Sequence, residues 1–190
     1  MNNKTLTLLA LAALSAGSLS ARGEYDEIAR LQAMNERVQG IRSMADGEHY
    51  TTLENNDIRR YAYATDSEGV SLLPSPAPNL AISDYAFSPD ERMILIASGR
   101  TPIYRHSYTT QYHLLADGRI RPVLQEAEAP RDASFSPDGR KIAYSDRNDL
   151  YVWDIATGKT QRITDDGAWN AVINGTTDWV YEEEFGTTRA

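Results

Sequence analysis

The sequence predicts an all-β, antiparallel fold, and three observations support this prediction. From about His49 onward the chain consists of short runs rich in tyrosine, threonine, valine and isoleucine, which are favoured in strands. Clusters of asparagine, aspartate, glycine and proline separate these runs at close and regular spacing. One of the turn motifs also occurs twice. Many short strands between such turns are typical of sandwiches and propellers.

Residues 1–21 have the pattern of a secretory signal peptide. Lys4 gives a short positive start, residues 6–14 are apolar, and small residues suited to cleavage follow. A retained membrane anchor is the alternative, but the apolar run is shorter than the ~20 residues that span a bilayer. We therefore expect an exported protein that is periplasmic, on the cell surface or secreted.

A short amphipathic helix is expected near the mature amino terminus, between Tyr25 and about Val38. Apolar residues recur there at roughly helical spacing, at Ile28, Leu31 and Met34. We interpret residues 22–48 as a helical or edge segment that packs against the domain, and residues 49–190 as the all-β part.

An internal repeat narrows the fold class. The stretch Phe87-Ser88-Pro89-Asp90 recurs 48 residues later as Phe135-Ser136-Pro137-Asp138, and an apolar strand follows each copy. A period of about 40–50 residues with several strands per unit is typical of a β-propeller blade. In such a blade the aromatic residue packs between blades and the following residues form a tight turn. A β-sandwich with a coincidental repeat is the alternative. Glu91 replaces Gly139 in the first copy, which alters one turn.

The number of blades follows from this period. Residues 149–154 are expected to be the third strand of a blade, and residues 155–159 its hairpin turn. Residues 49–190 then supply about three blades, whereas typical propellers have four to eight. Three blades cannot close a ring. We therefore expect a partial β-propeller from a longer protein, rather than a chain that pairs with another.

Composition excludes several classes of function. The net charge of −8 and the pI of about 4.9 argue against a nucleic-acid-binding protein, which would show a basic face. The absence of cysteine excludes disulfides, thiolate metal sites and a cysteine nucleophile. The three histidines have no metal-ligand spacing. We expect neither a metal nor a cofactor.

Residues 178–185, Asp-Trp-Val-Tyr-Glu-Glu-Glu-Phe, form the most informative stretch. They place three consecutive carboxylates behind an aromatic-rich run that we interpret as a strand. Adjacent carboxylates repel one another, so such a run makes physical sense if a cation binds there. A run of glutamates alone is usually a solvated face. The aromatic prefix and the second motif at residues 104–112, Tyr-Arg-His-Ser-Tyr-Thr-Thr-Gln-Tyr, argue for a site instead.

Together the two motifs resemble the dipeptidyl peptidase IV family, which are serine exopeptidases of the prolyl oligopeptidase class. The order of elements is similar as well, and the resemblance covers roughly residues 45–190. It implies an eight-bladed propeller that covers an α/β-hydrolase domain. This chain has no Gly-x-Ser-x-Gly motif, so no catalytic residue is assigned in it. The serine, aspartate and histidine of the triad would lie beyond Ala190.

The resemblance also assigns a substrate site. It implies that Glu183 and Glu184 anchor the free amino terminus of a peptide, and that Arg105 contacts the bound dipeptide while bridging one glutamate. Glu182, Tyr181 and Trp179 are expected to have supporting roles. An α-amino group has a pKa of about 7.7–8.0 and is largely protonated at neutral pH. Carboxylates around it would make charge-assisted hydrogen bonds.

The leading hypothesis is the substrate-anchoring part of an enzyme that removes X-Pro or X-Ala dipeptides. Its partners would be peptides with a free amino terminus and the hydrolase domain, and the family commonly forms a homodimer. The alternatives are a non-catalytic peptide-binding or protein-binding propeller and a propeller of another enzymatic class. Within the same class, a tripeptidyl peptidase is a further alternative.

Expressed alone, the 190-residue chain should be aggregation-prone and inactive, because an open arc of blades exposes strand edges and apolar faces between blades. Size-exclusion chromatography and thermal unfolding would test this expectation. A soluble monomer that unfolds in one cooperative transition would contradict it.

Overall fold

The computed structural model describes residues 39–65, 68–75 and 79–189 of the 190-residue chain. The expected signal peptide and the helix expected near residues 25–38 lie outside these ranges. Within the described residues, no helix is long and apolar enough to cross a membrane.

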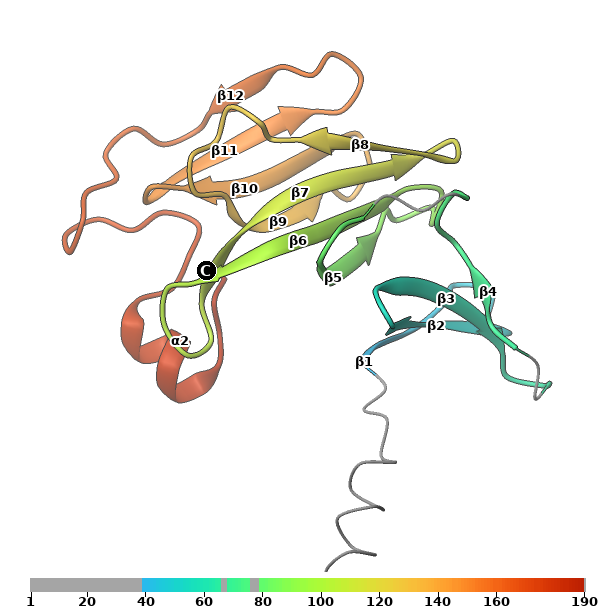
Figure 1. Cartoon of the computed structure of the whole chain (residues 1–190). Helices are drawn as coiled ribbons and strands as arrows, with labels where there is room; N and C mark the ends of the chain where they lie inside the picture. Colours follow the sequence, from blue (N-terminus) through green and yellow to red (C-terminus); the bar gives the residue numbers. More distant parts are fainter. Residues whose placement is uncertain (1–38, 66–67, 76–78, 190) are drawn as a thin grey trace, which may run out of the picture. The chain divides into compact units, whose positions relative to one another are not determined.

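The described residues form three four-stranded antiparallel sheets in which strands consecutive in sequence are neighbours (Figure 1). The first sheet contains β1 (Gln39–Ser43), β2 (His49–Glu54), β3 (Asp57–Ala62) and β4 (Val70–Ser71). The second contains β5 (Ile82–Phe87), β6 (Ile94–Pro102), β7 (Tyr108–Ala116) and β8 (Arg119–Val123). The third contains β9 (Arg131–Phe135), β10 (Lys141–Asp146), β11 (Asp149–Asp154) and β12 (Thr160–Arg162). The all-β prediction and the number of units are therefore confirmed, and residues 149–154 are the third strand of their sheet.

Two-residue turns fix the register of the hairpins inside each sheet. The central residues of these turns all have positive φ, as a type I′ turn requires. They are Asn55 and Asn56 (49° and 65°), Asp117 and Gly118 (49° and 68°), and Arg147 and Asn148 (48° and 67°). The residues on either side of each turn pair directly, for example Glu54 with Asp57. Because a shift of one residue would reverse the two faces of a strand, these turns determine which side chains are buried.

The repeated Ser-Pro-Asp motif makes the same turn in the second and third sheets. The Ser88 hydroxyl donates to the Asp90 carboxylate at 2.7 Å, and the Ser136 hydroxyl donates to Asp138 at 2.6 Å. These hydroxyl bonds lower the pKa of both carboxyls. The two turns connect β5 to β6 and β9 to β10, so the repeat marks the first hairpin of each unit.

Glu91 adopts the left-handed conformation that Gly139 has in the second copy. Its φ is 57°, compared with 68° for the glycine. A residue with a side chain pays about 1–2 kcal/mol for this conformation. The Glu91 carboxylate, however, accepts a hydrogen bond from the backbone N–H of Ala45 at 2.7 Å. The departure from glycine therefore supplies a contact to the first sheet.

The first sheet contains a third copy of this turn that the sequence analysis missed. It connects β1 to β2 and includes Met44, Asp46 and Gly47. The N–H of Met44 donates to the His49 carbonyl at 2.9 Å, and the N–H of Gly47 donates to the Met44 carbonyl at 3.1 Å. The other two turns contain the same pair of bonds. Within the described residues, β-structure is thus already present at Gln39, before His49, and β1 lies inside the range 22–48, at the edge of the first sheet.

Two apolar clusters join neighbouring sheets. One contains Ile58 from the first sheet and Ile96 from the second, and the other contains Leu114 from the second sheet and Ile142 from the third. Burial of apolar surface between layers is the main force that holds such sheets together. The three units are therefore packed face to face in sequence order.

Buried tyrosine hydroxyls add polar contacts between the same sheets. The Tyr85 hydroxyl lies 2.8 Å from that of Thr51 in the first sheet. The Tyr112 hydroxyl accepts the backbone N–H of Ala133 in the third sheet at 3.2 Å. Burial raises the pKa of Tyr112 to about 12, so its hydroxyl stays neutral at physiological pH.

Strands β6 and β7 extend beyond their neighbours as a two-stranded arm. They still pair at Pro102 and Tyr108, whereas β5 and β8 no longer accompany them there. A bulge with Gly99 at φ 64° lies where the arm leaves the sheet. The Arg100 guanidinium lies 3.9 Å from the centroid of the Tyr108 ring and links the two strands of the arm. The arm presents its turn, residues 103–107, beside helix α2 (Trp179–Phe185) (Figure 1).

Substitution of Ile142 by alanine should destabilise the protein by about 2–5 kcal/mol, because it leaves a cavity between the second and third sheets. The measurement is the apparent melting temperature of the protein expressed from the complete reading frame that contains this chain. Ile163→Ala is the matched control, since that side chain is half exposed. Equal shifts for the two variants would contradict the assignment of Ile142 to a packed core.

Candidate functional site

The stretch with three glutamates is a helix, and its interpretation as a strand was wrong. Helix α2 begins after Asp178, whose carboxylate accepts the N–H groups of Val180 at 2.9 Å and Tyr181 at 3.1 Å. It ends at Gly186, which has a left-handed φ of 64°. Glutamate is a good helix former, and both helix ends are capped. A short helix therefore satisfies this stretch better than an additional strand would.

Three consecutive residues of a helix point in directions about 100° apart, so the three glutamates have different surroundings. Glu182 and Glu183 are buried, whereas Glu184 is exposed. The exposed side of α2 also carries Tyr181 and Phe185, whose rings are 5.5 Å apart. The helix thus turns two carboxylates toward the sheets and one toward solvent.

Glu182 forms a buried ion pair with Arg131 at the start of β9. The side chains of Glu182 and Arg131 are only 3% and 15% exposed. Arg131 also donates from Nε to the Asp132 carboxylate at 3.1 Å. Asp132 in turn accepts from the Thr188 hydroxyl at 2.7 Å. The third sheet therefore holds the helix and the residues that follow it.

Glu183 connects α2 to the turn of the β6–β7 arm. Its Oε1 accepts the backbone N–H of His106 at 3.2 Å, and its Oε2 lies 3.6 Å from Arg105 Nε. The Glu183 side chain is 7% exposed, whereas the Arg105 side chain is 74% exposed. The structure thus brings together two of the residues that the sequence analysis selected, with the guanidinium on the solvent side.

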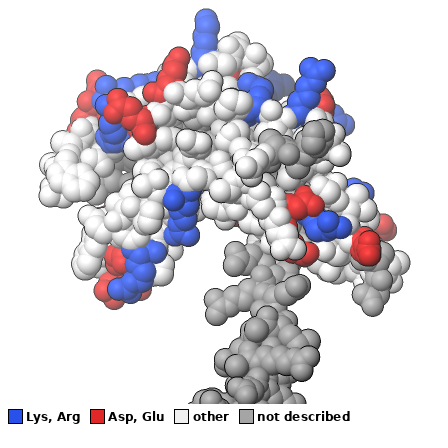
Figure 2. Space-filling model, viewed as in Figure 1, with Lys and Arg blue, Asp and Glu red and all other residues white. Residues whose placement is uncertain are grey.

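Glu184 is the one acid of the three without a protein partner in the described part of the chain. It makes no hydrogen bond or ion pair there, and its side chain faces solvent. It follows Glu183 directly in α2, and the two side chains leave the helix about 100° apart. Figure 2 shows acidic and basic side chains together in the region of α2.

The charges of this cluster do not balance. Glu182 faces Arg131, Glu183 faces Arg105, and Asp132 faces Arg131 and Arg189, the last at 3.7 Å. Among the described residues, Glu184 and the cap residue Asp178 have no ion-pair partner. A helix also disfavours acidic residues toward its carboxyl end. A cationic group that binds near Glu183 and Glu184 would therefore meet a carboxylate that is not already paired.

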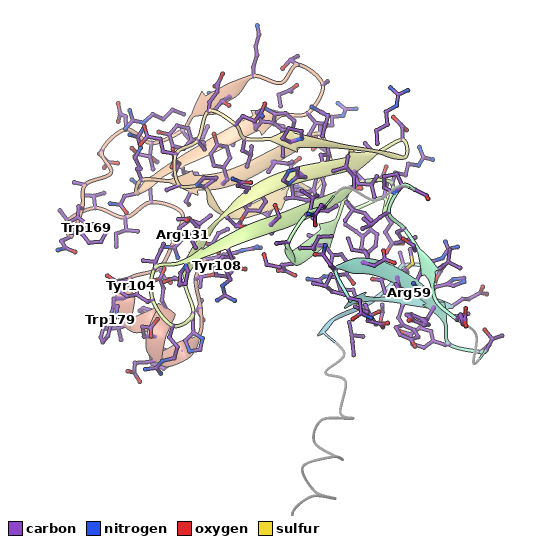
Figure 3. The ribbon with its side chains drawn as sticks, in the orientation of Figure 1. Arg59, Tyr104, Tyr108, Arg131, Trp169 and Trp179 are labelled. Atoms are coloured by element: carbon purple, nitrogen blue, oxygen red, sulfur yellow. The ribbon has the colours of Figure 1, made fainter. Side chains whose placement is uncertain are left out.

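Trp179 faces a cavity, whereas Tyr181 lies on the exposed side of α2 that also carries Glu184. Trp179 lines a cavity of about 550 Å³ together with Tyr104 and Trp169, and Arg131 and Glu182 also contribute to its wall (Figure 3). Within the described ranges, neither Trp179 nor Tyr181 makes a hydrogen bond or ion pair with Glu183 or Glu184. Any support that these two aromatic residues give the site comes through the helix itself.

The sequence analysis did not select Arg131, Asp132 or Asp178. The sequence does contain a signal for Asp132. Asp132 precedes the second copy of the repeated motif by the same number of residues as Asp84 precedes the first copy. Asp84 likewise binds an arginine, Arg42, at 2.7 Å. No comparable signal existed for Arg131, because its partner lies 51 residues away in the chain. Among the described residues, no group of three or more candidate ligands could hold a metal ion.

Comparison with known proteins points to one family for this chain. The model of the dipeptidyl peptidase IV (DPP IV) N-terminal region matches residues 88–190. Dipeptidyl peptidase 4 of Felis catus is 40% identical over 107 residues, which are 55% of this chain and 14% of that protein. Dipeptidyl peptidase 4 of Trichophyton rubrum is 35% identical over 147 residues, which are 76% of this chain and 18% of that protein.

A solved structure gives the same result. The crystal structure of Porphyromonas gingivalis dipeptidyl peptidase 4 superposes with a TM-score of 0.71 at 35% identity, over 80% of this chain and 23% of that one. The similarity confirms the propeller architecture of the three sheets. The chain spans less than a quarter of the length of these relatives.

Loss of the Asp178 cap should loosen α2. Asp178→Ala removes the acceptor for two N–H groups at a cost of about 1 kcal/mol, which corresponds to roughly fivefold faster amide exchange in the helix. Hydrogen–deuterium exchange of a peptide that covers residues 179–186 measures this effect. Asp178→Asn retains an oxygen acceptor and is the control. Equal exchange rates in the two variants would show that the cap does not stabilise the helix.

Proposed function

Because the chain belongs to the family of the dipeptidyl peptidase IV N-terminal region, we propose that it anchors the substrate of a serine exopeptidase that removes dipeptides from peptides. The observation that supports this proposal is that the exposed Glu184 has no ion-pair partner among the described residues, next in sequence to Glu183, which faces Arg105. A protonated amino terminus would supply a positive charge there.

The two carboxylates would act differently on the amino group. Glu183 is already oriented by the N–H of His106 and by Arg105, so little freedom is lost when it accepts a further hydrogen bond. Glu184 is exposed and would close on the ammonium from the solvent side. Together they would provide charge-assisted hydrogen bonds from two directions.

Arg105 would bind the peptide rather than the amino group. Its Nε faces Glu183, and its other N–H groups make no hydrogen bond within the described part of the chain. A guanidinium has five donors in a planar fork, so those that remain can donate to a backbone carbonyl of the bound dipeptide. The same contact would keep two adjacent carboxylates from repelling each other.

Anchoring the amino terminus at a fixed place would determine which peptide bond is cleaved. Only the bond two residues from the anchor would reach a nucleophile held at a constant distance. The nucleophile, base and orienting acid would come from an α/β-hydrolase domain, and the second residue of the substrate would be proline or alanine. Export of the protein would place this activity among extracellular or periplasmic peptides.

Glu183→Gln and Glu184→Gln should each lower kcat/KM for a chromogenic Gly-Pro substrate by about 10- to 100-fold, because a neutral amide loses the charge-assisted bond. The assay uses the protein expressed from the complete reading frame that contains this chain. Acetylation of the substrate's amino group should abolish turnover in the parent protein.

Glu126→Gln is the matched control, since Glu126 is an exposed acid in the loop before β9. Turnover of the acetylated substrate at the parent rate would rule out an amino-terminal anchor. An inactive parent protein that still binds the free-amine peptide would favour a non-catalytic peptide-binding module.

A further inference from the structure

Arg131 neutralises a carboxylate that would otherwise be isolated from water. Glu182 is almost fully buried, and the described residues offer it no ion-pair partner other than Arg131. A buried and unpaired carboxylate is strongly unfavourable, so the helix would have to move to rehydrate it if the arginine were absent. The position of α2 therefore depends on this contact.

Arg131 is itself held in place. Its Nε donates to Asp132 at 3.1 Å, and its backbone lies in β9, paired with Ser145 of β10. Asp132 also binds Thr188 and Arg189, which follow α2. The start of β9 thus binds the chain both inside the helix and after it. Figure 3 shows Arg131 near Tyr104 of the β6–β7 turn and Trp179 of the helix.

The direction of one helical side chain determines the directions of its neighbours. Successive residues differ by about 100° around the axis, so fixing Glu182 against Arg131 fixes the rotation of α2. That rotation turns Glu183 toward the arm and Glu184 toward solvent. A helix of seven residues has little packing of its own to resist rotation.

We infer that Arg131 is a positioning residue, which aims Glu183 and Glu184 at the ligand's ammonium group by holding Glu182. This inference rests on the proposed function, in which the two carboxylates bind the amino terminus. It assigns Arg131 no contact with the substrate. Its loss should therefore weaken binding of the free amino group and leave the chemical step intact.

Arg131→Met should raise KM for the Gly-Pro substrate by about tenfold or more and change kcat by less than about threefold. Arg131→Lys should have a smaller effect, because an ammonium keeps the positive charge beside Glu182. Some effect should remain, because an ammonium cannot bridge Glu182 and Asp132 as a planar guanidinium does. Arg60→Met is the control, since Arg60 is exposed and makes no hydrogen bond or ion pair in the described residues.

The double variant Arg131→Met with Glu182→Leu separates positioning from direct contact. Replacing a buried ion pair by apolar residues of similar size is often tolerated, so α2 should return to its position against β9. We expect KM to return to within about threefold of the parent value. A KM in the double variant as high as in Arg131→Met alone would overturn the inference, because it would mean that the guanidinium binds the ligand itself.

The proposed function and this inference fail in different ways. An inactive parent, or a parent insensitive to Glu183→Gln, would contradict the proposed function. A parent that depends on Glu183 but has an unchanged KM in Arg131→Met would contradict only the inference. If Arg131→Met does not fold, the comparison uses Arg131→Lys and the double variant. A KM that is raised in Arg131→Lys and lower in the double variant supports the inference. A KM that is higher in the double variant than in Arg131→Lys overturns it.

Discussion

The site depends on the compensation of negative charge in a very short helix. Helix α2 carries three adjacent carboxylates in seven residues, and this arrangement is unfavourable without cations nearby. The third sheet supplies one guanidinium and the β6–β7 arm supplies another. The helix is therefore held by electrostatic contacts to two different sheets, rather than by an apolar core of its own.

This arrangement explains why the site is built from distant parts of the sequence. The arm, the start of β9 and α2 come together because packing between the sheets brings their ends to one place. The sheets have tight turns and well-packed apolar clusters, and they position the charged side chains at their ends. Helix α2 is short; Glu182 binds it to the third sheet through Arg131, and Thr188 binds the residues after it to Asp132.

Local patterns in the sequence were sufficient for the second and third sheets, but not for β1 of the first sheet or for the helix. Alternation and turn residues are local signals, so strands such as β10 and β11 were predictable. The aromatic residues before the glutamates suggested a strand, but capping by Asp178 and Gly186 decided for a helix. Arg105 and Glu183 were selected through a resemblance, and the structure places them 3.6 Å apart. Arg131 could not be found, because only the fold brings it to Glu182.

The three copies of the first-hairpin turn show that few residue positions of this turn have to keep the same amino acid. Their common chemistry is a carboxylate that accepts a nearby backbone N–H and a residue that tolerates positive φ. Serine and proline are replaced in the copy at Met44, and glycine is replaced at Glu91. Related blades can therefore diverge beyond recognition by sequence while they keep the same geometry. The hydrogen-bond pattern of this turn therefore locates the start of a unit even where its residues differ.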